Sequence, residues 1–424
     1  MKILMQSIGT RGDIEPFLAQ AEILSRHGHE IGCCFPEQFR KLVQGLGYEF
    51  YGLDRRFLEM LESQTGQSVM GGSENSWKRF QNFFKLASRG LKLQDNLIAQ
   101  QLYSLQNFKP EKVIFHPKCV FPILWEIAYP GTTIMICPLP CALHEVRELS
   151  TMTFSGNANY GTFLNLLSHR LVNTIRAGVF NRITRKYRKH LPPFRVNAKI
   201  IKRTMLHQIP ALYTISPSLF PRPTCWPSHL HVTGYFERSQ RSNWQPPAEL
   251  LQFIERHHKI LMVTFGSMRN PDPLNKTMSV IEAVTQLNIP TIINTSWGGL
   301  EKPEEHPPSI CFVSNVPYSW IFPKMHAVVH HGGAGTTHAA CKHACPSLII
   351  PHIVDQYFWN QRIAYLKLGP KGLPIKKLNK DRLLPLLQDL WDNDQYKGCA
   401  VTISQCMATE TKPQAIRSLL QSYS

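Results

Sequence analysis

The segment 327–351, with the sequence AVVHHGGAGTTHAACKHACPSLIIP, constrains the fold more than any other part of the chain. It opens with the apolar run Ala327–His331, passes through small, helix-compatible residues over 336–344, and closes with the apolar run Ser347–Ile350. Glycines separate the first run from the helical part. Short apolar runs bounded by glycine and proline are typical of parallel strands covered on both faces. The segment therefore predicts a strand, a turn, a helix and a second strand of a parallel sheet.

The turn in this segment can bind an anion, because the first N–H groups of a helix have no partner within the helix. Glycines let a phosphate approach the backbone closely, and Thr336 and Thr337 can add hydroxyl donors. His331 ends the strand, where it can hydrogen-bond an oxygen of the same anion. No lysine follows the glycines, and His338 replaces the third glycine of the dinucleotide fingerprint, so neither a P-loop nor a nicotinamide site is expected. The alternative interpretation is a tight turn whose glycines serve packing alone.

Strand and helix patterns alternate along the whole chain. Strands are expected at 2–7, 30–35, 48–51, 113–116, 133–137, 212–215 and 231–234, and again at 259–265, 291–294, 310–313, 327–331 and 347–350. This alternation predicts doubly wound parallel sheets, in which ligands bind beyond the carboxyl ends of the strands. A chain of 424 residues is too long for one ordinary core, and the polar segment 237–247, which contains two prolines, is the best boundary between two domains.

Positive charge is concentrated in one block of the sequence. The net charge is +18, and the block 149–236 contains no Asp or Glu but twelve Lys and Arg residues, which indicates an anionic partner such as a nucleic acid or a lipid surface. A helical pattern over 160–190 carries an apolar stripe at Leu164, Leu167, Leu171, Ile175, Val179 and Ile183. Such a stripe favours a buried core face. The alternative is a basic amphipathic helix that contacts anionic lipid.

The sequence also predicts the cellular location of the protein. The first residues lack the apolar region and cleavage site of a signal peptide, and no stretch is apolar enough to span a membrane. The eleven cysteines have no regular spacing, which favours free buried thiols. We therefore expect a cytoplasmic protein, monomeric, with peripheral membrane contact left open.

The ungapped run from His330 to Gly369 resembles the donor-binding signature of the family 1 glycosyltransferases. The closest resemblance is to the bacterial and fungal branch that glucosylates sterols, other lipids and antibiotic aglycones. That branch has the turn His-His-Gly-Gly-x-Gly-Thr-Thr, a helix of small residues, a proline and an Asp-Gln pair. Weaker matches stand at Phe265-Gly266-Ser267, at Val316-Pro317 and near the N-terminus, so the resemblance spans most of the chain.

The resemblance implies a GT-B architecture, in which two doubly wound Rossmann-like domains face each other across a cleft. It assigns residues 1–236 to an acceptor-binding domain, 237–256 to a linker and 257–408 to a nucleotide-sugar-binding domain. Residues 409–424 are expected to form a helix that packs back on the first domain.

The resemblance also implies roles for residues of the second half. The donor diphosphate would be bound by Gly266, Ser267, His331, Gly333, Gly335 and Thr336. Asp355 and Gln356 would bind the sugar hydroxyls, and Val316 and Trp297 the nucleoside. The plant branch has a tryptophan before this valine and a glutamine after the proline, where Asn315 and Tyr318 stand here, so the choice between uridine and thymidine stays open.

Asp13 is the candidate catalytic residue of the first half. It follows the first strand in the loop Thr10-Arg11-Gly12-Asp13, just beyond the carboxyl end of the strand. The ordinary role of Asp in this setting is to cap a helix. The resemblance implies instead that Asp13 is the general base, since the loop is similar to that of the sterol and antibiotic enzymes, whereas the plant branch uses a histidine.

These residues together predict an inverting transfer without a metal or other cofactor. Only Asp392-Asn393-Asp394 has the spacing of a metal-binding DxD motif, and it lies in a helix-linker context; the turn at His331 could neutralise the diphosphate instead. The leading hypothesis is a transferase that moves a hexose, with glucose preferred, from a UDP-sugar to a lipid or sterol-like hydroxyl. The alternatives are a transferase for soluble polyketide or peptide antibiotics and a non-catalytic lipid- or nucleic-acid-binding protein. We do not expect nucleic acid as the partner.

Overall fold

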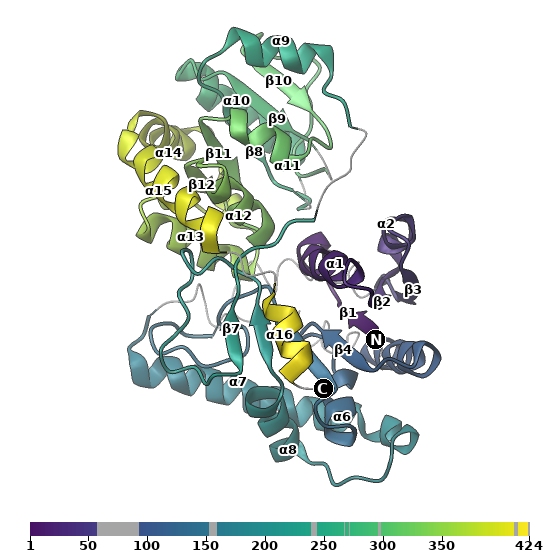
Figure 1. Ribbon diagram of the computed structural model, residues 1–424. Coiled ribbons are helices and arrows are strands. Elements are labelled where there is room, and N and C mark those ends of the chain that lie inside the picture. The colour runs from purple at the N-terminus through teal and green to yellow at the C-terminus, as the bar shows by residue number, and fades with distance from the viewer. Residues whose placement is uncertain are drawn as a thin grey trace. The chain divides into compact units, whose positions relative to one another are not determined.

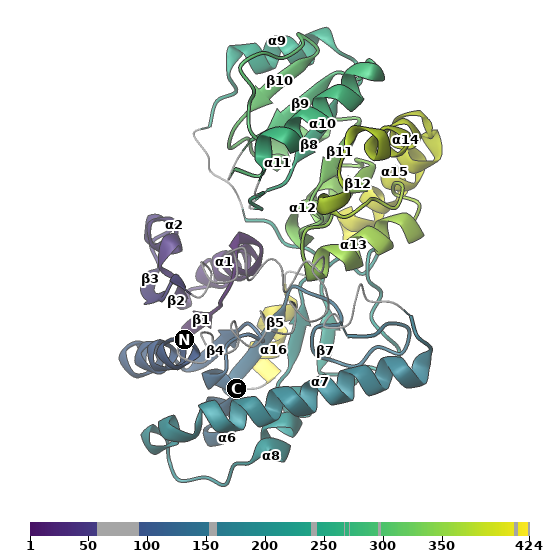
Figure 2. The ribbon, with the colours of Figure 1, turned by 180° about the vertical axis from the view of Figure 1, so that it is seen from behind.

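A computed structural model provides the structure of the chain. It describes residues 1–56, 93–151, 159–238, 244–266, 268–270, 272–295, 298–410 and 414–422. The chain divides into two compact units (Figures 1 and 2). Unit 1 comprises Met1–Ser239 with Thr411–Ser424, and unit 2 comprises Gln240–Glu410.

Unit 1 is built on a seven-stranded sheet in the order β3-β2-β1-β4-β5-β6-β7, and every adjacent pair is parallel. The strands are β1 Lys2–Gln6, β2 Glu30–Pro36, β3 Glu49–Leu53, β4 Lys112–Phe115, β5 Thr133–Cys137, β6 Ala211–Tyr213 and β7 Leu230–Val232. All seven coincide with apolar runs of the sequence, because a parallel strand packs apolar side chains on both faces. The predicted doubly wound sheet is confirmed.

Helices cover this sheet. Those of unit 1 are α1 Arg11–Ser25, α2 Arg40–Gly45, a helix over 93–108, α6 Phe121–Ala128, α7 Thr162–Ile183, α8 Ala198–Arg203 and α16 Ala415–Ser422, with short helices η1 Glu37–Phe39, η3 Arg185–His190 and η4 Thr204–Gln208. One core cluster joins β1, β2 and α1 to α16 through Ile416, Leu419 and Leu420. The last helix of the chain thus belongs to the same core as the first strand.

Unit 2 repeats the architecture on a smaller scale. Its five-stranded parallel sheet has the order β10-β9-β8-β11-β12. The strands are β8 Leu261–Thr264, β9 Thr291–Asn294, β10 Ile310–Val313, β11 Ala327–His330 and β12 Ser347–Ile349. The helices are α9 Ala248–Arg256, α10 Pro273–Gln286, α11 Tyr318–Ile321, α12 Ala334–Lys342, α13 Val354–Tyr365, α14 Lys380–Asp392 and α15 Asp394–Glu410, with η6 Phe322–Lys324 and η7 Ile375–Lys377.

Several parts of the chain differ from the expectation. The expected linker 237–256 contains α9, whose Leu250 and Phe253 are buried in unit 2. Helix α15 was not predicted, since its apolar residues are scattered around Gly398. The stripe on α7 was expected in the core, but its leucines are exposed, because the opposite, polar face of the helix hydrogen-bonds the preceding loop.

The strand order places one switch point in each sheet. In unit 1 the chain passes from β1 to β2 on one side of the sheet and from β4 to β5 on the other. In unit 2 it likewise passes from β8 to β9 on one side and from β11 to β12 on the other. Loops diverge at such a point and leave a crevice beyond the carboxyl ends of the strands, where doubly wound sheets bind ligands. Asp13 after β1 and His331 after β11 therefore lie next to the switch points of their sheets. No helix in the described ranges has both the length and the apolar character needed to cross a bilayer.

Candidate active site

Asp13 lies at the switch point of unit 1, in the first turn of α1. Its backbone N–H donates to the carbonyl of Thr10, and its Oδ2 accepts the N–H of Thr10 at 2.9 Å. The tight turn depends on Gly9, whose φ is 149° and where a Cβ would collide with the Asp13 carboxylate. The loop geometry therefore fixes this carboxylate, which is buried.

His116 and Lys118, which follow β4 in the chain, contact Oδ1, the other carboxylate oxygen of Asp13. The Lys118 ammonium donates to Oδ1 at 2.7 Å, and His116 Nε2 lies 3.3 Å from the same oxygen. His116 Nδ1 accepts the backbone N–H of Lys118 at 3.0 Å, so the proton of a neutral ring is on Nε2 and faces the carboxylate. Because β1 and β4 are neighbours in the sheet, residues about a hundred positions apart form one cluster.

The charges of this cluster keep Asp13 ionised. Burial alone would raise the pKa of Asp13, but the Lys118 ammonium and the His116 ring outweigh it and hold that pKa well below its usual range. Burial lowers the pKa of His116, so the ring is neutral at physiological pH. The cluster contains a carboxylate, an ammonium that is 39% exposed and a buried neutral imidazole.

Asp13 thus has the expected helix-capping contact and a separate charged contact. Oδ2 satisfies a backbone donor at the helix start, which is the structural role, while Oδ1 faces Lys118 and His116. Of the other loop residues, Gly12 is exposed, and Arg11 donates to Glu15 along the surface of α1 at 2.9 Å. Arg11 therefore does not join the Asp13 cluster.

The switch point of unit 2 contains the turn between β11 and α12. His330 is fully buried, and its Nδ1 accepts the N–H of Gly332 at 3.1 Å, which shapes the turn. Gly332 has a φ of 87° and leaves no room for a side chain, since a Cβ would lie 2.6 Å from Ile349. The first histidine of the pair is therefore structural.

The ring of His331 lies between two glycines. A Cβ on Gly266 would lie 2.6 Å from its Cε1, and a Cβ on Gly333 would collide with its Nε2. Nδ1 of His331 is buried and has no hydrogen-bond partner in the described ranges. Burial lowers the pKa of His331 to about 4, so the ring is neutral and can donate one hydrogen bond rather than a charge. The absence of a side chain at Gly266 and Gly333 thus makes room for this imidazole. This structural role is separate from the predicted contact of the two glycines with the diphosphate.

Helix α12 begins at this turn without a side-chain cap. Gly333 is its N-cap, Gly335 and the buried Thr336 lie in its first turn, and intrahelical bonding begins with the N–H of Thr337. The Thr337 hydroxyl donates to the carbonyl of Gly333 at 3.0 Å, so it is used within the helix and is not the expected free donor. The N–H groups before it keep the partial positive charge of a helix N-terminus.

Helix α13 begins beside the same turn, because a Cβ on Gly332 would also touch Gln356. The side-chain oxygen of Gln356 accepts the backbone N–H groups of His352 and Ile353 at 2.6 and 3.1 Å, so it caps α13 and leaves only the amide nitrogen for another partner. Asp355, in the same turn, is partly exposed. The two residues therefore present different groups, a carboxylate and an amide, at this edge of the sheet.

Val316 follows β10, two strands away from β8 in the sheet, and is packed in the core. The neighbouring Tyr318 connects this loop to the switch point, since its hydroxyl lies 3.0 Å from that of Thr264 at the end of β8. Ser267 and Trp297 lie outside the described residues.

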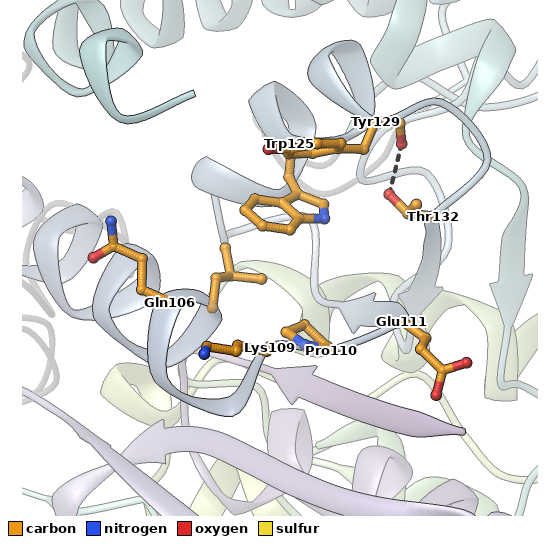
Figure 3. Close-up of a pocket in the computed structure, with 8 residues that line it drawn as sticks. Gln106, Lys109, Pro110, Glu111, Trp125, Tyr129 and Thr132 are labelled. Carbon is orange, nitrogen blue, oxygen red and sulfur yellow. Dashed lines mark hydrogen bonds between the residues drawn. The ribbon is translucent and has the colours of Figure 1, made fainter. Parts of the chain in front are cut away.

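A separate cavity of about 450 Å³ opens in unit 1 (Figure 3). Trp125 and Tyr129 form its aromatic wall, and Lys109 and Glu111 lie across from them. Lys109 and Glu111 come just before β4, Trp125 lies in the last turns of α6, and Tyr129 lies between α6 and β5. The cavity is therefore at the amino ends of the strands, opposite Asp13. It is therefore not part of the candidate site.

Sequence reasoning missed three residues of these clusters. His116 and Lys118 contact Asp13, and His352 packs near His331 with ring centroids 6.5 Å apart. The sequence contained one signal for His116, since this residue directly follows the apolar run of β4 at the carboxyl end of the strand. Which strand lies beside β1 could not be read from the sequence.

Two known protein families match separate parts of the chain. Residues 3–114 match the family described as glycosyltransferase family 28 N-terminal domain, and residues 278–422 match erythromycin biosynthesis protein CIII-like, C-terminal domain.

The chain is also similar to curated proteins over nearly its whole length. A sterol 3-beta-glucosyltransferase of Arabidopsis thaliana is 30% identical, covering 97% of this chain and 63% of its own length. One of Eremothecium gossypii is 27% identical over 96% of this chain and 33% of its own. The chain thus spans about three fifths of the plant relative and a third of this fungal one.

Solved structures share the fold. The glycotransferase of kitacinnamycin has a TM-score of 0.69 and 15% identity, covering 100% of this chain and 98% of its own. A spinosyn rhamnosyltransferase solved with thymidine diphosphate has a TM-score of 0.68 and 14% identity, covering 99% and 100%.

Proposed function

Because the chain belongs to the family 1 glycosyltransferases of the GT-B type, we propose that it is a transferase that moves a hexose from a UDP-sugar to a lipid or sterol-like hydroxyl. Glucose is the preferred sugar, since the curated relatives named above are glucosyltransferases for sterols. Unit 2 would bind the donor and unit 1 the acceptor.

The observation that carries the proposal is the turn after β11. It combines the uncapped start of α12 with a neutral imidazole whose Nδ1 is buried without a hydrogen-bond partner in the described ranges. A diphosphate would supply the missing acceptor for His331 and would interact favourably with the N–H groups of Gly335 and Thr336. These groups can stabilise the charge that develops on a departing nucleoside diphosphate, so the proposed reaction requires no metal ion.

Asp13 is the proposed general base of unit 1. An acceptor hydroxyl is only weakly acidic, and a carboxylate at hydrogen-bond distance can take its proton as the new bond to the sugar forms. A single displacement on the opposite face of the sugar inverts the anomeric centre. The low pKa of Asp13 makes it a weak base, so Lys118 must weaken its contact with Oδ1 when the hydroxyl arrives. His116, whose Nε2 lies 3.3 Å from Oδ1, would hold the carboxylate in place during this exchange.

The test is direct turnover by the purified full chain. UDP-glucose and a sterol dispersed in detergent should yield a steryl glucoside detectable by mass spectrometry, together with UDP. Replacing UDP-glucose by a TDP-sugar determines the nucleoside preference, and replacing the sterol by a polyketide aglycone tests the soluble-acceptor alternative. Absence of transfer or hydrolysis with every nucleotide sugar tested would refute the proposal and favour a binding protein.

A further inference from the structure

Helix α7 of unit 1 buries a row of polar side chains and exposes a row of large apolar ones. Asn165, Ser168, His169 and Asn173 are buried, together with Ala177. The opposite face is exposed over the whole length of the helix, with exposed fractions of 77% for Phe163, 51% for Leu171 and 59% for Ile175. Leu164, Leu167 and Val179 complete the exposed set. We call these six residues the α7 stripe.

Hydrogen bonds to the preceding loop explain this orientation. Asn165 Nδ2 donates to the carbonyl of Arg147 at 2.9 Å, and Asn173 Nδ2 donates to that of Leu143 at 2.8 Å. The His169 ring lies 3.1 Å from the carbonyl oxygen of Leu149. The buried polar side chains of α7 thus face main-chain carbonyls of the loop, while another part of the helix packs against α8. Burying those carbonyls without partners would be costly, so the polar face must turn inward.

The α7 stripe is long and continuous. A helix of 22 residues is about 33 Å long, and Figure 2 shows α7 as a long, nearly straight helix. Single exposed apolar residues are normal on a protein surface, but a contiguous apolar stripe marks an interaction surface.

The charge around the stripe identifies its partner. The block 149–236 has no acidic residue, and exposed basic residues follow the stripe at Arg182, Arg185 and Lys189. A second copy of the chain would bring the same basic surface against itself, which opposes association. An apolar stripe flanked by Arg and Lys fits the headgroup region of an anionic bilayer, where apolar side chains enter the acyl boundary and cations meet lipid phosphates.

We propose that α7 lies in the plane of an anionic membrane surface and docks unit 1 on it. The stripe begins after the loop that leaves the carboxyl end of β5, the same edge of the sheet as Asp13, so docking would bring this edge to a membrane-dissolved acceptor. The inference deepens the proposed function, but lipid binding can be measured without turnover.

Vesicle flotation of the full chain tests the proposal. The protein should float with phosphatidylcholine vesicles that contain phosphatidylserine, binding should weaken with added salt, and vesicles without anionic lipid should bind far less. The triple variant Leu167→Ser, Leu171→Ser, Ile175→Ser should lower the partition coefficient at least about tenfold, because its changes remove three apolar anchors. A matched control, Leu251→Ser, Leu274→Ser, Val401→Ser, changes exposed apolar residues of unit 2 and should bind like the wild type.

A charge variant supplies the second measurement. Arg182→Gln, Arg185→Gln, Lys189→Gln should reduce binding by roughly fivefold per residue at low salt and flatten the salt dependence. Failure of the wild type to bind anionic vesicles at low salt would overturn the proposal, as would a stripe variant that binds undiminished. A wild-type dimer in solution that the stripe variant dissociates would assign the stripe to a second copy instead.

Turnover separates this proposal from the proposed function. With UDP-glucose and a detergent-dispersed sterol, the stripe variant should retain wild-type activity while losing activity on vesicle-embedded sterol. Undiminished membrane binding without any transfer would refute the proposed function and leave the docking intact.

Discussion

Replacing Gly333 by alanine separates a ligand-binding turn from a turn built for packing alone. Gly333 has a φ of −62° and a ψ of 142°, which alanine adopts without strain. The added Cβ, however, would collide with Nε2 of His331. The substitution therefore acts through the imidazole, which must move away from its place between Gly266 and Gly333.

Two magnitudes follow from this geometry. Overpacking a close contact costs about 1–3 kcal/mol of stability. A hydrogen bond to a charged group contributes about 1.5–3 kcal/mol, so displacing the His331 donor should lower the affinity for free UDP by about 10- to 150-fold. If the glycines serve packing alone, only the stability should fall.

Calorimetry with UDP and thermal unfolding measure the two effects on the same protein. Gly398→Ala is the matched control, since this residue lies inside α15 with open space where a Cβ would stand. It should leave UDP affinity unchanged and raise stability by about 0.5–1 kcal/mol, because alanine favours a helix more than glycine does. A folded Gly333→Ala protein that binds UDP like the wild type would refute the role assigned to His331.

Further predictions concern both units. Asp13→Asn should lower transfer ~10²–10⁴-fold while UDP affinity stays unchanged; near wild-type kcat in a folded variant would exclude the base role. Because the pKa of Asp13 is lowered in the fold, its stabilisation should be present above pH of about 4 and lost as the pH falls further; the difference in unfolding free energy between wild type and Asp13→Asn should therefore shrink on acidification, and a constant difference would contradict this. His331→Ala should weaken UDP binding as much as Gly333→Ala does, which calorimetry tests. Activity should survive EDTA, and a loss restored by Mg²⁺ or Mn²⁺ would contradict the metal-free scheme.

The sheets could be predicted from the sequence because a parallel strand produces its own local signal. The strands of both units fall on short apolar runs of the sequence, and the turn at His331 has the glycines that its geometry requires. The position of Asp13 after β1 could be predicted for the same local reason. These features depend on neighbours within a few residues.

Features that depend on distant partners could not be predicted. Lys118 contacts Asp13 only because β4 pairs with β1, and no local pattern encodes that pairing. The apolar period of α7 showed that the helix has an apolar face but not which way that face points. The direction is decided by carbonyl groups of the preceding loop, and hydrogen bonds to main-chain atoms leave no trace in side-chain periodicity.

The placement of α16 has a consequence for how the protein is made. Ile416, Leu419 and Leu420 complete a core whose other members come mostly from the first strands and first helices of the chain. A ribosome adds these three residues only after every residue of unit 2, so the core of unit 1 stays open during synthesis of Gln240–Glu410. Nascent unit 1 therefore exposes apolar surface while unit 2 can already fold. Ribosome-bound chains that stop before Thr411 should need chaperones, whereas chains that include α16 can close the core of unit 1.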